Sequence, residues 1–245
     1  MSRYIYTVGA GITGGRKTSV VETSPRFSCC IVYKFMIKLL RIKVFREKGI
    51  FMAYDYNKST ALIIGMTDTD EKVTAASGRI STQEGTALSI WDKSQDREKN
   101  ANLIGKVTAS GHTSTVEHTY FQLAFHNVTA VVEQFIIEFR LASYTVKSRR
   151  YVNFSDAGFY VPEFNDAEIE NSYKAHMSKM FALYDELCAN GVLREDARFV
   201  LPYCLYSNFF CSVNGREFLN MLTAMICGRG AKYPEIKKLG LELYE

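Results

Sequence analysis

The sequence lacks several features that would narrow its class. No uninterrupted apolar run approaches the roughly 18 residues that a transmembrane helix needs, so we expect no membrane partner. Neither Cys-x-x-Cys nor His-Glu-x-x-His occurs, and the six cysteines and four histidines have no regular spacing. We therefore expect no metal site and no disulfide framework. Unpaired cysteines are typical of a reducing compartment, which predicts a cytoplasmic protein.

Charge is distributed unevenly along the chain. Residues 1–51 carry ten Lys or Arg against two acids, whereas the remainder carries twenty against twenty-four. The net charge of +4 therefore comes from the N-terminal segment, and we infer no nucleic-acid partner from it. An apolar content of 47% is sufficient for a substantial core.

The N-terminal segment has two interpretations. The stretch from Phe27 to Phe45 is apolar but interrupted by basic residues, so it could be an amphipathic helix at a membrane surface. We favour a poorly ordered basic extension over residues 1–51, with the functional domain over residues 52–245. The Gly-x-Gly-x-x-Gly match at Gly9–Gly14 lacks a clear following helix and a downstream acid, so we take it as coincidence.

Residue patterns predict an α+β fold, a twisted and mainly antiparallel sheet flanked by helices. Strands are expected at 61–66, at 152–161 and at 203–213, and the alternation of Phe121, Leu123 and Phe125 predicts a further, half-buried strand. Helices are expected from Asp68 to Gly78, at 94–109, at 130–143, from Asn165 or Asp166 to about Cys188, at 194–202, and after Asn214.

Two apolar stripes predict core packing. On the expected helix over 130–143, spacing places Phe139 toward the core with Glu138 beside it. On the longest helix, one face carries the residues Ile169, Tyr173, Met177, Met180, Phe181, Tyr184, Leu187 and Cys188.

A basic segment follows the expected helix over 130–143. Arg140, Lys147, Arg149 and Arg150 lie close together without an intervening acid, and the hydroxyls of Ser143 and Ser148 fall between them. Guanidinium forks and hydroxyls bind phosphate oxygens, so the segment is a candidate phosphate cradle. The alternative is a solvated basic loop.

Two smaller constellations are also candidates. Glu117 and His118 at a strand entrance could form an acid–imidazole pair, although a structural histidine near a turn is the commoner case. Arg216 and Asn220 are four residues apart on an expected helix and therefore share a face.

The basic segment resembles the signature of the flavin-dependent thymidylate synthases, which is Arg-His-Arg, seven residues, Ser, one residue, Arg-Tyr. Arg140, Ser148, Arg150 and Tyr151 match this signature in register. Glu138 and Phe139 stand where the family has its first Arg and its His.

Further blocks resemble the family in the same order along the chain. They are the segment Ser110–His118, the phrase Ala197-Arg198-x-x-Leu201-Pro202, and Asn214-Gly215-Arg216 with Asn220. In the last block, Ile226 occupies the position of an arginine that polarises the pyrimidine in the family. Arg229, in a turn between Gly228 and Gly230, is the candidate replacement.

The resemblance implies conversion of dUMP to dTMP with bound FAD, and with methylenetetrahydrofolate and NADPH as co-substrates. It implies a nucleotide site formed by Lys147, Ser148, Arg149, Arg150 and Arg198, with Ser148 and Arg229 catalytic. It implies a flavin site formed by His118, Tyr120, Glu138, Phe139, Arg140, Asn214, Arg216 and Asn220. It also implies a homotetramer whose FAD sites are shared between subunits.

The departures at residues 138, 139 and 226 leave two related alternatives open. The protein could bind FAD and a pyrimidine nucleotide without methylating it, or it could act on a different pyrimidine nucleotide. A nucleic-acid binder is a third alternative, which the acidic character of residues 52–245 disfavours.

Overall fold

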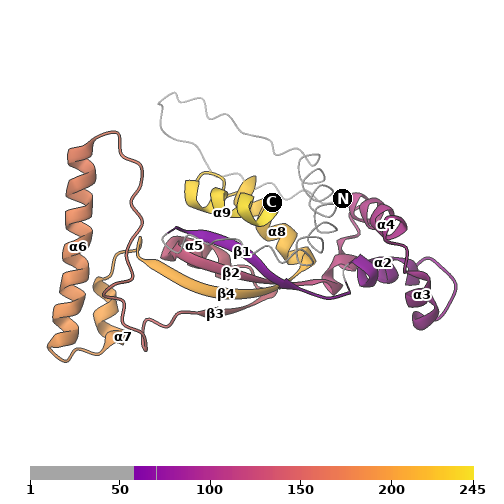
Figure 1. Ribbon diagram of the computed structural model, residues 1–245, viewed down its shortest axis with the longest axis horizontal. Helices are drawn as coiled ribbons and strands as arrows, with labels where there is room; N and C mark the ends of the chain where they lie inside the picture. The colour runs from indigo at the N-terminus through magenta and orange to yellow at the C-terminus, as the bar shows by residue number, and fades with distance from the viewer. Residues whose placement is uncertain (1–57, 70) are drawn as a thin grey trace, which may run out of the picture.

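A computed structural model describes residues 58–69 and 71–245. The expectations for residues 1–51, the Gly9–Gly14 motif and the domain boundary at residue 52 lie outside the described residues. The described chain has the predicted α+β fold, a four-stranded antiparallel sheet with helices packed on it (Figure 1). Within the described ranges, no helix has both the length and the hydropathy needed to cross a bilayer.

The sheet has the strand order β1-β2-β4-β3. Its strands are β1 (Thr60–Met66), β2 (Tyr120–Thr129), β3 (Ala142–Val146) and β4 (Tyr206–Asn214). Strand β4 is central, because it pairs with β2 from Tyr120↔Asn214 to Thr129↔Tyr206 and with β3 on its other side. Where the β2–β4 register shifts, Asn127 adopts a positive φ of 46°, and its N–H donates to the side-chain oxygen of Asn208.

Helices α5, α8 and α9 pack on one side of the sheet (Figure 1). The predicted alternation on β2 is confirmed, since Phe121, Leu123 and Phe125 are buried against these helices. Side chains of the opposite parity, such as Tyr120 and Phe210, are 49% and 59% exposed. The sheet therefore has one covered and one open face.

The remaining helices gather at the two ends of the sheet (Figure 1). At one end, α2 contacts α3, α4 and the 3-10 helix η1; at the other, α6 contacts α7 and the 3-10 helix η2. The α-helix bounds are α2 Glu71–Ile80, α3 Ala87–Lys93, α4 Arg97–Ala109, α5 Ala130–Ile137, α6 Ala167–Ala189, α7 Arg194–Ala197, α8 Gly215–Ile226 and α9 Pro234–Tyr244. The 3-10 helices are η1 Thr113–His118 and η2 Arg198–Val200.

The predicted helix over 130–143 is too long. Helix α5 ends at Ile137, and residues 142–146 form β3. The hydroxyl of Tyr144 lies 2.9 Å and 2.7 Å from the carbonyl oxygens of Ile136 and Phe139, at the end of α5 where the helix supplies no further turn of N–H donors. Tyr144 lies on the following strand, so the spacing of apolar residues along the helix could not indicate this contact. Phe139 does pack against the core, as its spacing predicts.

Three further expectations need correction. Residues 152–161 form no strand and make only an isolated bridge between Phe159 and Leu205, because Phe154 and Phe159 pack instead into a second apolar cluster with residues of α6. Ile169 is 55% exposed, since α6 buries mainly its C-terminal half through Phe181 and Tyr184. Helix α2 continues past Gly78, whose bare Cα faces Leu103 on α4, and α3 was not predicted.

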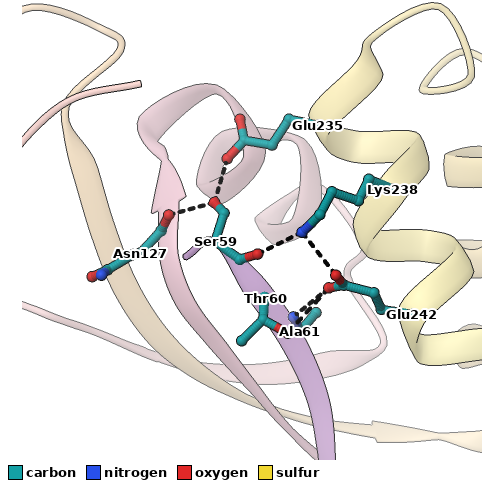
Figure 2. A network of polar contacts seen from close by, with 7 residues as sticks. All are labelled: Ser59, Thr60, Ala61, Asn127, Glu235, Lys238 and Glu242. Carbon is teal, nitrogen blue, oxygen red and sulfur yellow. Dashed lines mark hydrogen bonds and ion pairs between the residues drawn. The ribbon is translucent and has the colours of Figure 1, made fainter. Parts of the chain in front are cut away.

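Helix α9 is tied to the sheet by a polar network (Figure 2). Glu235 accepts hydrogen bonds from Ser59 and from both the N–H and the hydroxyl of Thr129, the N-cap residue of α5. Glu242 accepts from the N–H of Ala61 on the free edge of β1. The network therefore fixes the start of α5 and covers part of an edge that could otherwise pair with another chain.

Glu235→Ala should reduce the free energy of unfolding by about 2–3 kcal/mol. The change leaves the N–H of Thr129 without its acceptor, and such groups are costly when buried. Urea titration of the variant measures the loss. Lys237→Ala, on the exposed side of the same helix, should change the value by less than about 0.5 kcal/mol; equal effects of the two changes would contradict the role of Glu235.

Candidate functional site

The basic loop after β3 is held by backbone contacts at both ends. The N–H of Lys147 donates to the carbonyl of Asn208 on β4, at 2.9 Å. The hydroxyl of Ser148 accepts from the N–H of Arg150, and the carbonyl of Ser148 accepts from Val152. The loop is therefore an ordered turn attached to β4, which fits a cradle better than a freely solvated segment.

Arg149 is directed away from this turn toward α5. Its guanidinium forms two hydrogen bonds with the carboxylate of Glu133, at 3.0 Å and 2.7 Å. The side chains of Arg149 and Glu133 are only 21% and 11% exposed. The fork of Arg149 is thus occupied by an internal carboxylate, and its contact joins the loop to α5. Nearby, the ammonium of Lys147 lies 5.0 Å from the ring centre of Phe154.

Arg150 and Arg198 meet at a single residue. The Nε of Arg150 donates to the carboxylate of Glu195 at 2.8 Å, and the Nε of Arg198 donates to the backbone carbonyl of Glu195, also at 2.8 Å. The residues are separated by a long insertion that contains α6, yet the fold brings them together at the start of η2. Because Nε is the bound atom in both, the terminal nitrogens of both guanidinium groups remain available for a ligand.

Part of the group expected on the flavin side lies at the other end of β4, namely His118, Tyr120, Asn214, Arg216 and Asn220. Asn214 pairs with Tyr120 across the sheet, and its side chain accepts from the N–H of Glu217 to cap α8. Gly215 follows it, and a side-chain carbon there would lie 2.5 Å from the carbonyl oxygen of Val116. Only glycine therefore allows α8 to start so close to η1.

Polar side chains of this group are exposed around the start of α8. Arg216 donates to Glu117 at 2.7 Å, and Asn220 donates to Glu217 at 3.0 Å. Arg216, Asn220 and His118 are all solvent-exposed, and His118 ends η1 beside them. The predicted common face of Arg216 and Asn220 on α8 is confirmed. The sequence also suggested an acid–imidazole pair of Glu117 and His118; in the structure the carboxylate of Glu117 contacts Arg216.

A third group lies between α5 and the turn before α9. Arg229 forms an ion pair with Glu138, and its guanidinium carbon lies 4.5 Å and 5.8 Å from the ring centres of Phe135 and Phe139. The residues Val131, Gln134, Phe135, Glu138, Tyr203, Arg229, Lys232, Tyr233 and Ile236 line a cavity of about 300 Å³ here. Arg140, just beyond α5, is exposed.

The fold therefore divides the candidates into separate groups. The segment of β4 from Asn208, beside the basic loop, to Asn214, beside the start of α8, spans roughly 20 Å at the usual rise per strand residue. Within one chain, a phosphate held by Arg150 and a ring held by Arg216 would not share a pocket.

Sequence reasoning missed the acidic partners of these arginines. Glu133, Glu195 and Glu117 contact Arg149, Arg150 and Arg216 from positions that are distant in sequence. The spacing of Glu195 and Arg198, three apart on a short helix, was one available indication that these two residues lie on a common surface.

The sequence matches one protein-family model and several known proteins. Residues 62–245 match the family model described as "Thymidylate synthase complementing protein". The chain is 29% identical over 172 residues to a flavin-dependent thymidylate synthase from Pyrococcus abyssi, which covers 64% of this chain and 69% of that protein. It is 31% identical over 145 residues to one from Geobacter sulfurreducens, covering 58% of this chain and 62% of that protein.

A solved structure has a similar fold. A UMP/dUMP methylase, PolB, from Streptomyces cacaoi bound with 5-Br dUMP superposes with a TM-score of 0.65. The match covers 76% of this chain and 88% of that one, at 21% sequence identity. This supports the common architecture of sheet and helices.

Replacement by Gln should lower stability at Arg149 but not at its neighbour Arg150. Arg149→Gln leaves the carboxylate of Glu133 nearly buried and unpaired, so it should reduce the free energy of unfolding by about 3 kcal/mol. Arg150→Gln breaks a solvent-exposed pair and should leave the melting temperature almost unchanged. Thermal unfolding of both variants under one condition makes the comparison, and a reversed order would contradict these assignments.

Proposed function

Since the chain belongs to the thymidylate synthase complementing protein family, we propose that it is an FAD-dependent thymidylate synthase that converts dUMP to dTMP. Methylenetetrahydrofolate would donate the one-carbon unit, and NADPH would supply the reducing equivalents. The observation that carries the proposal is the convergence of Arg150 and Arg198 on Glu195, which gathers two cationic forks suited to a phosphate monoester.

The nucleotide site would be formed by the basic loop together with Arg198. Arg150 and Arg198 would bind the phosphate through their terminal nitrogens, with the hydroxyl of Ser148 as a further donor. Lys147, on the same turn, would add positive charge. Arg149 contributes by bracing the turn against Glu133, in a supporting role rather than the direct phosphate contact expected from sequence.

The flavin site is assigned to the group around the start of α8. Arg216 and Asn220 are exposed donors on one helical face, and their chemistry fits the oxygen- and nitrogen-bearing edge of a flavin ring. Asn214, Tyr120 and His118 lie beside them, and Arg140 is a further exposed cation for the cofactor's phosphates. When bound, FAD would carry the hydride that reduces the transferred carbon to a methyl group.

The protein's own contribution to the chemistry is placement and charge. C5 of the pyrimidine gives an electron pair to the incoming carbon, and when C5 then loses its proton the electron pair of the C–H bond returns to the ring, so negative charge develops on the ring oxygens at that step. Arg229 is the proposed cation for this charge, and Ser148 would keep the nucleotide in register. Burial raises the pKa of the Cys211 thiol to about 12, which makes this residue unsuited to act as a nucleophile.

We propose a homotetramer with shared sites, as the resemblance implies, and the spacing of the groups supports the sharing. The roughly 20 Å along β4 between the phosphate group and the flavin group supports a site completed by a second copy of the chain. The open sheet face, with Tyr120 and Phe210, offers apolar area for such an assembly. We assign this function to residues 52–245 as one domain in the cytoplasm.

The alternative is a homologue that binds FAD and a pyrimidine nucleotide without methylation. The ion pair between Arg229 and Glu138 favours it, because the carboxylate partly neutralises the cation that would act on the ring. The other alternative is an enzyme that acts on a different pyrimidine nucleotide. Measuring turnover of several pyrimidine nucleotides distinguishes it from both.

The purified protein should contain FAD and release tritium from dUMP labelled at C5 when methylenetetrahydrofolate and NADPH are present. Arg150→Gln and Arg198→Gln should each raise the KM for dUMP by about 10- to 100-fold, since each removes a charged contact to phosphate. Bound flavin with nucleotide binding but no tritium release would favour the alternative. Absence of both flavin and nucleotide binding would refute the proposal.

Shared sites make a separate prediction. At a dUMP concentration well below the raised KM, Arg198→Gln and Arg216→Gln, one from each group, should both be nearly inactive when expressed alone. Coexpressed, they should recover up to about a quarter of the activity, because some sites then receive both intact groups from different subunits. Coexpressed Arg198→Gln and Arg150→Gln, which lie in one group, serve as the control and should recover none.

A further inference from the structure

Residues that depart from the family pattern meet in one place. Glu138 and Phe139 replace the family's Arg and His, and Arg229 lies in the segment where the family's arginine is replaced by Ile226. Although Glu138 and Arg229 are 91 positions apart, the guanidinium of Arg229 donates to the carboxylate of Glu138. Phe139 borders the same guanidinium. The departures at 138 and 139 therefore both adjoin Arg229, the candidate replacement for the family's arginine.

The backbone that carries Arg229 is closely constrained. The N–H of Gly230 donates to the carbonyl of Ala224 at 2.9 Å. A side-chain carbon on Gly230 would lie 2.7 Å from Ile236 and 2.9 Å from the ring of Phe135. The turn thus rests directly on the core, which fixes where the side chain of Arg229 begins.

The guanidinium itself is held from two directions. The ring of Phe135 lies under it at 4.5 Å, which favours the cation over the aromatic face. Glu138 supplies the only carboxylate that contacts Arg229 in the described part of the chain. Stacking on the ring of Phe135 fixes the distance of the guanidinium from the ring but leaves the guanidinium free to rotate in its own plane. The direction in which its nitrogens point therefore depends on Glu138.

The oriented fork lies at a cavity suited to a ring. The cavity of about 300 Å³ has an apolar floor from Phe135 and Ile236, and Tyr203 and Lys232 also line it. Arg229 remains 52% exposed, so part of its donor edge is open. A planar ring with carbonyl oxygens matches these surroundings, because it presents an apolar face and acceptors at its edge.

We propose that Glu138 is a positioning residue that acts through Arg229, orienting its guanidinium toward the carbonyl oxygens of a pyrimidine ring. This role rests on the proposed function and replaces the flavin contact that the resemblance implied for residue 138. Glu138 reduces the net charge near the ring, but it fixes the fork, and misplacement of a catalytic group costs more than partial neutralisation.

The test compares Glu138→Gln, Arg229→Gln and the double variant in the full-length holoprotein. Binding of dUMP is measured by the perturbation of flavin absorbance, in parallel with binding of deoxyribose 5-phosphate, which lacks the ring. Each single change should weaken dUMP binding by about 5- to 10-fold and leave the ring-free phosphate unaffected. The double variant should be no weaker than Arg229→Gln, because the two residues act as one unit.

Turnover provides a second measurement. Glu138→Gln should lower kcat for tritium release by about 10-fold or more, and Glu138→Asp should restore part of it, since a shorter carboxylate can still orient the fork. Glu186→Gln, an exposed acid on α6, is the matched control and should match the wild type. Flavin content and melting temperature confirm that each variant is folded.

Unchanged or tighter dUMP binding in Glu138→Gln, or additive losses in the double variant, would overturn the proposal. Equal weakening of the ring-free phosphate would also overturn it, because Glu138 would then act on the phosphate site. If the wild-type protein binds dUMP but releases no tritium, the proposed synthase function fails, while the binding comparison still decides the role of Glu138.

Discussion

The hydrogen bonding of β4 to strands on both of its sides is the constraint on which the candidate site depends. Pairing with β2 sets Asn214 opposite Tyr120, and pairing with β3 places the basic loop beside Asn208. The start of α8 follows one end of β4, and the helix that carries Arg198 precedes the other. A shift of one residue in either register would turn every side chain to the opposite face of the sheet and separate these groups.

Electrostatic pairing organises the ends of this scaffold. Arg149, Arg150, Arg216 and Arg229 each contact a carboxylate from a different element, and the degree of burial distinguishes their roles. The nearly buried pair with Glu133 holds the loop in place, because separating it would leave a charge in the protein interior. The exposed pairs of Arg150 and Arg216 are weak in water, so a ligand can compete for those two guanidinium groups.

Much of the fold was predictable, because it follows local periodicity and capping. Alternating Phe121, Leu123 and Phe125 indicated β2, and Asp166 with Asn190 indicated the ends of α6. Prediction failed at residues 138–143, where the apolar spacing continues but the hydroxyl of Tyr144 folds back onto the end of α5. The approach of Arg150 to Arg198 was expected only through resemblance, and Glu195, which joins them, is recognised only in three dimensions.

The contact between Glu138 and Arg229 has an evolutionary consequence. A single substitution that restored the family's arginine at position 138 would set two guanidinium groups against each other above the ring of Phe135. Loss of Arg229 alone would leave an acid facing the cavity. Either single change therefore leaves a repelling or an unpaired charge beside the cavity, so residues 138 and 229 are expected to change together.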